Sequence, residues 1–227
     1  MKRIGSQVTI AMDGPAGSGK STVARRIAER LGLLYLDSGA MYRAVTLLAI
    51  QEKLAADSPK LIDLVKACRI EFTNNGKTIL LDAEDVSVQI RTPVVNKLVA
   101  DVAKIPEIRR EIVKHQQRIG AAGNIIAEGR DLTTIVFPNA DFKFYLDASV
   151  TERAKRRLAE LQTQNVDVTL AAVEAEIRAR DEKDTTREHS PLRAAEDAII
   201  IDTTCTTVEE VVDSIIAQIR RSEECQQ

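Results

Sequence analysis

Short apolar segments alternate with amphipathic helical segments along most of the chain. Residues 8–12 carry apolar side chains at every second position, a glycine-rich turn follows, and residues 20–30 place apolar side chains at helical spacing. Further short apolar runs lie at residues 33–36, 124–127, 142–146 and 198–201. The pattern predicts an α/β fold in which a doubly wound parallel sheet of five strands is covered by helices on both faces.

Two segments depart from this alternation. Residues 70–81 alternate apolar and polar side chains around Asn75 and Gly76, which predicts a small antiparallel hairpin. Residues 149–187 are helical in pattern and heavily charged. We therefore expect one domain over residues 1–227. Its core would comprise residues 7–37, 121–148 and 194–222, with an inserted subdomain at 38–120 and a helical lid at about 150–190.

Composition limits the classes of partner. The chain has 32 Lys and Arg against 34 Asp and Glu, and only 3% aromatic residues with no Trp, so we expect no nucleic acid polymer as ligand. No apolar run has the length of a signal peptide or a membrane span, which predicts a cytoplasmic protein without a membrane partner. No interface stripe stands out, which favours a monomer. Cys68, Cys205 and Cys225 are too widely separated for a disulfide framework or paired metal ligands, and we expect Cys225 to be exposed.

A phosphate-binding motif follows the first predicted strand. Gly14, Gly19, Lys20 and Ser21 have the spacing of a P-loop, and they lie between a strand and a helix. Such a loop directs backbone N–H groups at phosphate oxygens, while the lysine reaches the β- and γ-phosphates and the hydroxyl binds magnesium. The alternative is a glycine-rich turn that fits the spacing by chance. The residues expected to bind ATP are Gly14, Pro15, Ala16, Gly17, Ser18, Gly19, Lys20, Ser21, Thr22 and Arg157.

The loop alone does not separate a kinase from a switch GTPase or a motor ATPase. A guanine-reading switch carries an Asn-Lys-x-Asp element, whereas Asn96 and Lys97 are followed by Leu98 and Val99. This absence disfavours the switch.

An acceptor site is expected where the second and third core strands end. Ser38 and Arg43 follow the strand at 33–36, at the sheet edge where ligands bind in such folds. The alternative is that Ser38 only caps a helix and Arg43 is a surface charge. Glu128, Arg130 and Asp131 follow the strand at 124–127, where Glu128 is placed to hold a metal-bound water. Arg130 and Asp131 could instead form a salt-bridged turn.

The charged segment supplies candidate phosphate ligands. Most of its arginines are expected to be solvated, but two or three would stabilise the charge of a transferring phosphoryl group when a lid closes. The cluster comprises Arg153, Arg156, Arg157, Arg178, Arg180, Asp184 and Arg187. His115 and His189 are the only histidines, and we expect His115 on an exposed helix face and His189 in a loop. No general base stands out, which suits an acceptor phosphate that is already ionised.

Several further motifs resemble the bacterial cytidylate kinases, within the nucleoside monophosphate kinase family. The similarity extends from Thr9 to about Ile216. It rests on residues 13–21, 36–43, 81–91 with Asp85-Val86-Ser87, Gly129-Arg130-Asp131 with Phe137-Pro138, and 180–187. The resemblance implies phosphoryl transfer from ATP to CMP and dCMP with Mg²⁺. It also implies a P-loop core, a monophosphate-binding subdomain with a small antiparallel β element, and a mobile helical lid.

The resemblance also implies functional roles for the residues of this chain that stand at the family's motif positions. The catalytic residues would be Lys20, Arg130, Arg180 and Arg187. The CMP-binding residues would be Ser38, Arg43, Arg109, Arg130, Asp131, Arg180 and Asp184. Ser21 and, through a water molecule, Glu128 would hold the metal. Physical chemistry supports the base contacts, since Asp131 can accept from the N4 amine of cytosine while arginines donate to N3 and O2.

Two positions depart from the family pattern. Ala100 stands where the family has a serine near the base, and Thr133 stands where it has a glycine. Loss of the serine hydroxyl removes on the order of one hydrogen bond, about 1 kcal/mol, and would loosen selectivity. The alternatives are a P-loop kinase for another acceptor such as UMP, and a nucleotide-gated binding protein with negligible transfer.

Overall fold

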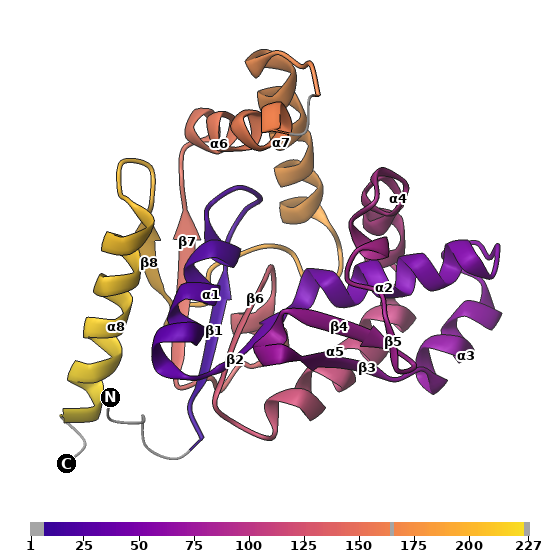
Figure 1. The fold of residues 1–227 in the computed structure, drawn as a ribbon, viewed down its shortest axis with the longest axis horizontal. Coiled ribbons are helices and arrows are strands. Elements are labelled where there is room, and N and C mark those ends of the chain that lie inside the picture. Colours follow the sequence, from indigo (N-terminus) through magenta and orange to yellow (C-terminus); the bar gives the residue numbers. More distant parts are fainter. Residues whose placement is uncertain (1–6, 164–165, 225–227) are drawn as a thin grey trace.

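A parallel five-stranded sheet forms the core of the protein (Figure 1). The computed structural model describes residues 7–163 and 166–224. The strands of the sheet are β1 (Thr9–Asp13), β2 (Leu34–Asp37), β6 (Ile125–Gly129), β7 (Phe142–Asp147) and β8 (Ile199–Asp202). They lie in the order β2-β6-β1-β7-β8, and every neighbouring pair is parallel. The predicted doubly wound sheet is confirmed.

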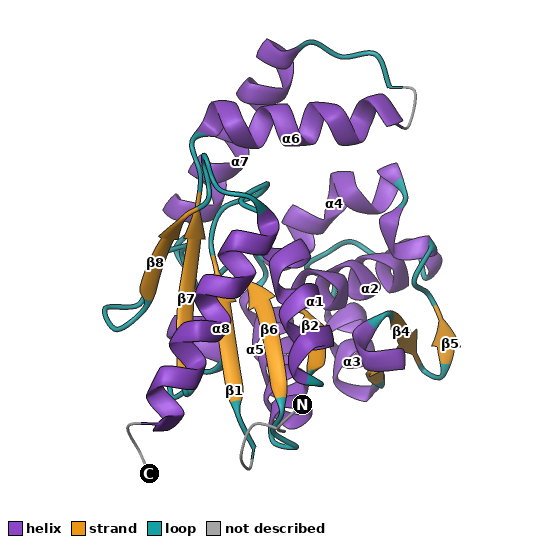
Figure 2. Cartoon of the chain, turned by 60° about the vertical axis from the view of Figure 1, so that its left-hand side comes forward, coloured by secondary structure: helices purple, strands orange, loops and turns teal. Residues whose placement is uncertain are grey.

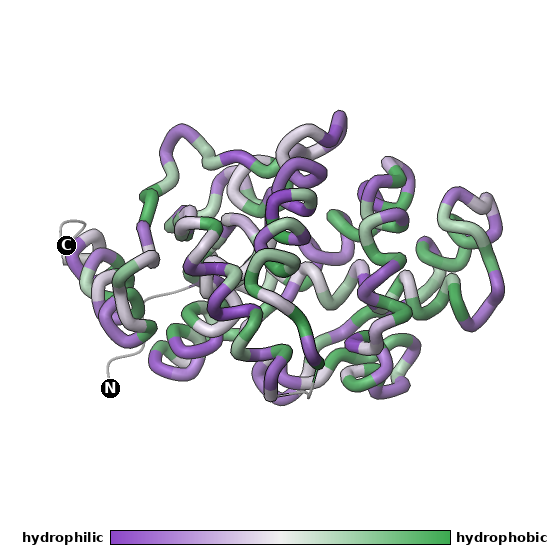
Figure 3. Tube along the Cα trace, turned by 90° about the horizontal axis from the view of Figure 1, so that it is seen from above, coloured by the Kyte–Doolittle hydropathy of each residue, from purple (hydrophilic) through white to green (hydrophobic). Residues whose placement is uncertain are grey.

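Helices cover both faces of this sheet, as Figure 2 shows. Alternate residues of β1 face opposite sides: Ile10 and Met12 pack with α1 (Lys20–Leu31) and α8 (Val208–Glu224), whereas Ala11 packs with α2 (Ser38–Gln51) and α5 (Pro106–Gly120). In α8, seen beside the C label in Figure 3, hydrophilic and hydrophobic positions alternate, because one face of the helix packs on the core.

Local signals in the sequence explain where the helices of the insert begin. Asp37, the last residue of β2, accepts a hydrogen bond from the backbone N–H of Ala40 and so caps α2, while Ser38 lies inside the helix. The helices α3 (Pro59–Ala67), α4 (Pro93–Ala103) and α5 each have a proline in the first turn, where the missing N–H is tolerated. A short 3₁₀ turn, η2 (Gln89–Arg91), precedes α4.

The predicted hairpin is confirmed as part of a second, antiparallel sheet. β3 (Ile70–Thr73) pairs with β4 (Thr78–Leu81) through the turn η1 (Asn74–Gly76), and β4 pairs with the two-residue strand β5 (Glu84–Asp85), which the sequence pattern did not indicate. Gly76 holds this sheet close to the core, since a Cβ atom there would lie 1.9 Å from the carbonyl oxygen of Tyr35.

The charged segment forms two helices that pack on each other beyond the end of the sheet (Figure 1). α6 (Val150–Thr163) and α7 (Leu170–Thr186) share a small apolar cluster of Ala154, Val173 and Ile177. Because this cluster is separate from the two core clusters, α6 and α7 have the packing expected of a lid.

The expectation for His115 is wrong. Its side chain is 7% exposed, and Nε2 lies 3.3 Å from the carbonyl oxygen of Val65 in α3. The reason is that α3 packs against α5. The expected exposure of Cys225 lies outside the described residues. Cys68 is buried and Cys205 is exposed.

Candidate active site

The glycine-rich loop lies between β1 and α1, as the motif requires (Figure 1). Gly14 and Gly19 have backbone φ angles of 146° and 88°, which residues other than glycine rarely adopt. A Cβ atom on Gly14 would also lie only 2.0 Å from the carbonyl oxygen of Leu146. Ser18 donates a 3.1 Å hydrogen bond from Oγ to the carbonyl oxygen of Pro15, which closes the loop on itself. The loop therefore has the curvature that a phosphate cradle needs, and a turn that fits by chance is disfavoured.

Lys20 lies inside the curve of this loop. Its Nζ atom donates hydrogen bonds of 2.6 Å to the carbonyl oxygen of Pro15 and 3.2 Å to Oγ of Ser18. Burial, followed by the positive charge of Arg130, lowers the pKa of Lys20 to about 7. A strongly desolvated ammonium group of this kind gains free energy from an approaching polyanion.

Glu128 forms the second feature of the site, beside the start of α1. The hydroxyl of Ser21 donates a 2.7 Å hydrogen bond to Oε1 of Glu128, and the hydroxyl of Tyr35 donates one of 3.1 Å to the same oxygen. Arg25 lies over the Tyr35 ring, with Cζ 4.9 Å from the centroid. Sequence reasoning placed Ser21 and Glu128 in the metal site but missed Tyr35, because the contact depends on β2 lying beside β6.

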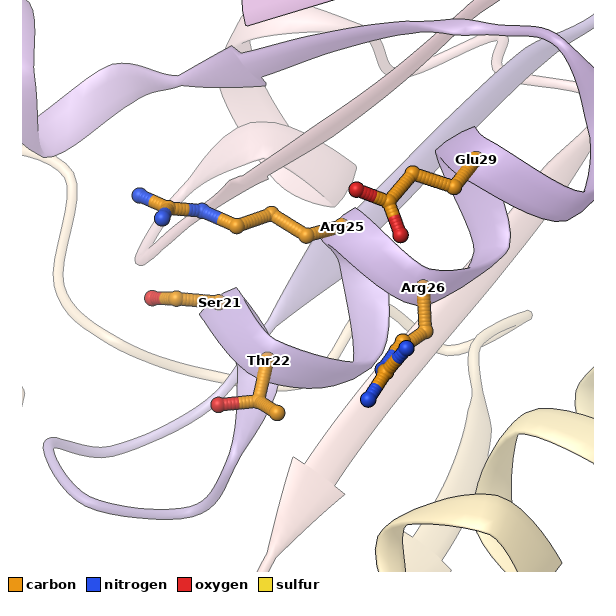
Figure 4. Close-up of a pocket in the computed structure, with 5 residues that line it drawn as sticks. All are labelled: Ser21, Thr22, Arg25, Arg26 and Glu29. Atoms are coloured by element: carbon orange, nitrogen blue, oxygen red, sulfur yellow. The ribbon is translucent and has the colours of Figure 1, made fainter. Parts of the chain in front are cut away.

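A pocket of about 410 Å³ lies next to this group. It is lined by Ser21, Thr22, Arg25, Arg26 and Glu29, all from α1 (Figure 4). Ser21 and Arg25 extend to one side of the helix, one turn apart. The pocket therefore places the hydroxyl of Ser21 beside two guanidinium groups and the carboxylate of Glu29.

A buried ion pair occupies the acceptor side. Nη2 of Arg109 donates to Oδ2 of Asp131, and both residues are at most 5% exposed. Arg109 also donates a 2.9 Å hydrogen bond to the carbonyl oxygen of Ala103, and its Cζ lies 5.3 Å from the centroid of the Tyr42 ring. The Tyr42 hydroxyl is buried without a hydrogen-bond partner among the described residues. Tyr42 lies within the 36–43 motif, but the sequence pattern gave it no role.

Arg130 and Asp131 do not form the salt-bridged turn that remained as an alternative. Nε of Arg130 lies 3.0 Å from Oδ2 of Asp184 on α7, whereas Asp131 pairs with Arg109. The two neighbouring residues therefore point to different partners, one toward the lid and one toward α5.

Ser38 and Arg43 lie on α2 beside this group. Ser38 is 5% exposed, and a Cβ atom on Gly129 would lie 2.5 Å from its Oγ, so the start of α2 packs tightly on the end of β6. Arg43 is half-buried and donates a 3.2 Å hydrogen bond from Nε to Oδ1 of Asn96. Ser38 is thus not the helix cap, and Arg43 is not a freely solvated charge.

Helix α7 and the residue that follows it contribute further cations. Desolvation, then the like charge of Arg130, lowers the pKa of Arg180, and desolvation, then Arg109, lowers the pKa of Arg187. Nη2 of Arg187 is buried without a hydrogen-bond partner among the described residues. The structure therefore brings Arg130, Arg180 and Arg187 to one region with more positive than negative charge, which an anionic ligand would stabilise.

Arg157, expected to bind ATP, is instead placed beside Glu160, with 2.9 Å between Nη1 and Oε2. Arg153, from the same cluster, contacts the cradle: its Nη1 donates a 3.1 Å hydrogen bond to the carbonyl oxygen of Ala16, and its Nη2 lies 2.7 Å from Oδ2 of Asp181. Arg153 thus connects the glycine-rich loop to helix α7. The role of Arg157 stays a prediction.

Residues 7–163 and 166–224 contain no cluster of three or more His, Cys, Asp or Glu side chains arranged to hold a metal ion. Within the same ranges, no helix combines the length and apolar character of a membrane span.

Comparison with known proteins gives one family over nearly the whole chain. The family model for cytidylate kinase matches residues 10–221. The chain is 48% identical to the cytidylate kinase of Carboxydothermus hydrogenoformans, covering 93% of this chain and 97% of that protein. It is 44% identical to the cytidylate kinase of Bacillus subtilis strain 168, with coverage of 95% and 97%.

Among solved structures, an uncharacterized protein from Eubacterium ventriosum matches with a TM-score of 0.52 at 15% identity, covering 95% of this chain and 99% of that one. This likeness shows the fold alone. The family assignment rests on the sequence matches and agrees with the P-loop and the second sheet described above. The chain belongs to the cytidylate kinase family.

Proposed function

We propose that the protein transfers the γ-phosphoryl group of ATP to CMP and dCMP, giving ADP and CDP or dCDP. The observation that carries the proposal is the buried Arg109–Asp131 pair, which lies at the same edge of the sheet as the phosphate cradle. Family membership supports the same reaction.

The base pocket is proposed to read cytosine by its hydrogen-bonding pattern. The carboxylate of Asp131 would accept from the N4 amine, while the guanidinium groups of Arg109 and Arg130 would donate to N3 and O2. Uracil carries an oxygen in place of the amine, so its O4 atom would face the carboxylate. That contact places two acceptors together and disfavours UMP.

The rest of the acceptor nucleotide would contact residues on α2 and α7. Ser38 and Arg43 would bind the phosphate, and Asp184 would accept from the ribose hydroxyls. Because Asp184 pairs with Arg130 in this structure, the acceptor would separate or share that pair when it binds. Tyr42, whose hydroxyl has no hydrogen-bond partner among the described residues, adds a donor at the same site.

The glycine-rich loop would hold ATP, the phosphate donor. Residues 14–22 would bind the phosphates of ATP through backbone N–H groups, and Lys20 would move from the carbonyl oxygen of Pro15 to the β- and γ-oxygens. Arg157 is proposed to contact ATP from the lid. Lys20, Arg130, Arg180 and Arg187 would stabilise the charge that spreads over the transferring group.

The residues present fit a magnesium ion. The Ser21 hydroxyl and the Glu128 carboxylate provide oxygen ligands 2.7 Å apart, and magnesium is usually held by one or two carboxylates together with substrate phosphates and water. Ser21 would bind the ion directly and Glu128 through water. When bound, the ion would neutralise charge on the β- and γ-oxygens. No general base is required, because the acceptor phosphate is largely ionised at neutral pH.

An ADP-release assay tests this function. ATP and magnesium are supplied with CMP, dCMP, UMP, AMP, GMP or shikimate in separate reactions, beside an acceptor-free control. Turnover confined largely to CMP and dCMP is expected. Comparable turnover of UMP would indicate that the pocket, with Ala100 in place of the family serine, does not discriminate. ATP binding without acceptor-dependent turnover would favour a binding protein.

A further inference from the structure

Asp13 is a fully buried carboxylate that no role above has used. It is the last residue of β1, directly before the cradle, and is 0% exposed. Its Oδ1 accepts a 2.9 Å hydrogen bond from the backbone N–H of Leu132. Its Oδ2 accepts two hydrogen bonds of 2.7 Å from Thr133, one from the backbone N–H and one from the hydroxyl. All three donors belong to residues 119 or 120 positions further along the sequence.

These donors lie at the start of the short π-helical segment η3 (Leu132–Val136), which follows the base-reading loop. The first N–H groups of a helix have no partner within it and need a capping acceptor. Asp131 is the residue at the capping position, and an aspartate there usually accepts from the N–H groups that follow. Here the Asp131 side chain makes no capping hydrogen bond. Its carboxylate pairs with Arg109 instead.

We propose that Asp13 is a positioning residue that caps η3 in place of Asp131, so that the Asp131 carboxylate is not used for capping and can face Arg109 and the acceptor base. The inference rests on the proposed role of Asp131. Without Asp13, the N–H groups of Leu132 and Thr133 would lose their acceptor, and the carboxylate at the capping position of their own helix is that of Asp131. Capping and base reading would then compete for one side chain.

Thr133 strengthens this arrangement. Its hydroxyl adds a third hydrogen bond to Asp13, at the position where the family pattern has a glycine, which would supply the N–H alone. The side chain is 1% exposed and β-branched, so its rotamer is restricted. The hydroxyl therefore fixes the loop relative to β1, and through β1 relative to the cradle.

The test compares Thr133→Val with Thr133→Ser. Valine keeps the shape and removes only the hydroxyl, whereas serine keeps the hydroxyl. The dissociation constant of CMP is measured by calorimetry without ATP, and KM for CMP, KM for ATP, kcat and the thermal midpoint are measured for each variant. We expect T133V to weaken CMP binding and raise its KM about fivefold, as for the loss of one hydrogen bond. KM for ATP should stay within twofold, and T133S should restore CMP binding to within twofold.

Three results would overturn the inference. CMP binding unchanged in T133V would show that the hydroxyl does not position the pocket. Equal increases in KM for CMP and KM for ATP in T133V would show that the hydrogen bond between Thr133 and Asp13 serves only the stability of the protein. The same conclusion would follow if T133S lost as much CMP binding as T133V. The proposed function is tested separately by turnover of CMP in the unaltered protein, so that its failure and that of the inference give different results.

Discussion

Tyr35 donates a hydrogen bond of 3.1 Å from its hydroxyl to Oε1 of Glu128, across the neighbouring strands β2 and β6. Ser21 donates to the same oxygen at 2.7 Å. In the part of the chain that the structure describes, no hydrogen bond to Oε2 of Glu128 is found. The two donors thus fix the orientation of the carboxylate and leave one oxygen for the water shell of the proposed magnesium ion.

Replacing Tyr35 with Phe should therefore weaken the response to magnesium. The change removes one hydrogen bond, so we expect the magnesium concentration for half-maximal activity to rise about fivefold, with kcat recovered at saturating magnesium. Binding of Mn²⁺ in the presence of ADP, followed by electron paramagnetic resonance, gives a readout independent of turnover. CMP binding without metal serves as the control and should not change. Unaltered Mn²⁺ affinity would contradict the positioning role of Tyr35.

The cradle could be predicted from sequence because its geometry is local. The glycine spacing, the preceding strand and the following helix lie within residues 8–31, and the structure has them in that form. The contacts of Tyr35 and Asp13 could not be predicted in this way. They depend on the strand order, which places β6 between β2 and β1 although 87 residues separate β2 from β6 in the sequence.

The wrong expectation for His115 has the same cause. His115 is buried because α3 packs on the face of α5 that carries it, and helical spacing alone does not show that contact. The sequence pattern does not distinguish among the arginines Arg153, Arg156 and Arg157. Their positions on α6 decide that Arg153 reaches the carbonyl oxygen of Ala16, whereas Arg157 pairs with Glu160.

Lys20→Ala should separate transfer from acceptor binding. The Lys20 ammonium is 4% exposed and hydrogen-bonded to the cradle, so its removal would take away a donor aimed at the transferring phosphate. We expect kcat to fall on the order of 100-fold, as for loss of a donor that stabilises charge in a transition state. The CMP dissociation constant, measured by calorimetry, should stay within twofold. Lys104→Ala, at an exposed residue paired with Asp101, is the matched control. Unchanged kcat would contradict the cradle assignment.

Asp131→Ala should weaken the binding of CMP, the phosphate acceptor, far more than the binding of ATP, the phosphate donor. The substitution removes the carboxylate proposed to bind cytosine and leaves Arg109 buried without its partner. A charged hydrogen bond contributes about 1.5–3 kcal/mol, so KM for CMP should rise about 10- to 100-fold, with KM for ATP within twofold. Asp101→Ala, at an exposed position of α4, controls for loss of a negative charge. Equal losses toward CMP and ATP would contradict the assignment of Asp131 to the base.

Asp13 should make stability depend on pH between about 4 and 7. Burial raises the pKa of its carboxyl from 3.8 to about 6, against the opposing effect of its hydrogen bonds to Thr133 and Leu132. A raised pKa means that the folded state favours the neutral form, so this contribution to the free energy of unfolding is present at low pH and is lost as pH rises through about 6. Between pH 4.5 and 7.5, the unaltered protein should lose about 2 kcal/mol of stability relative to Asp13→Asn, whose side chain does not ionise. Denaturant unfolding at several pH values measures this difference, and carbon-13 NMR of the Asp13 carboxyl should titrate near pH 6. A stability difference that does not vary with pH would show that the hydrogen bonds from Leu132 and Thr133 fully offset the effect of burial on the Asp13 pKa.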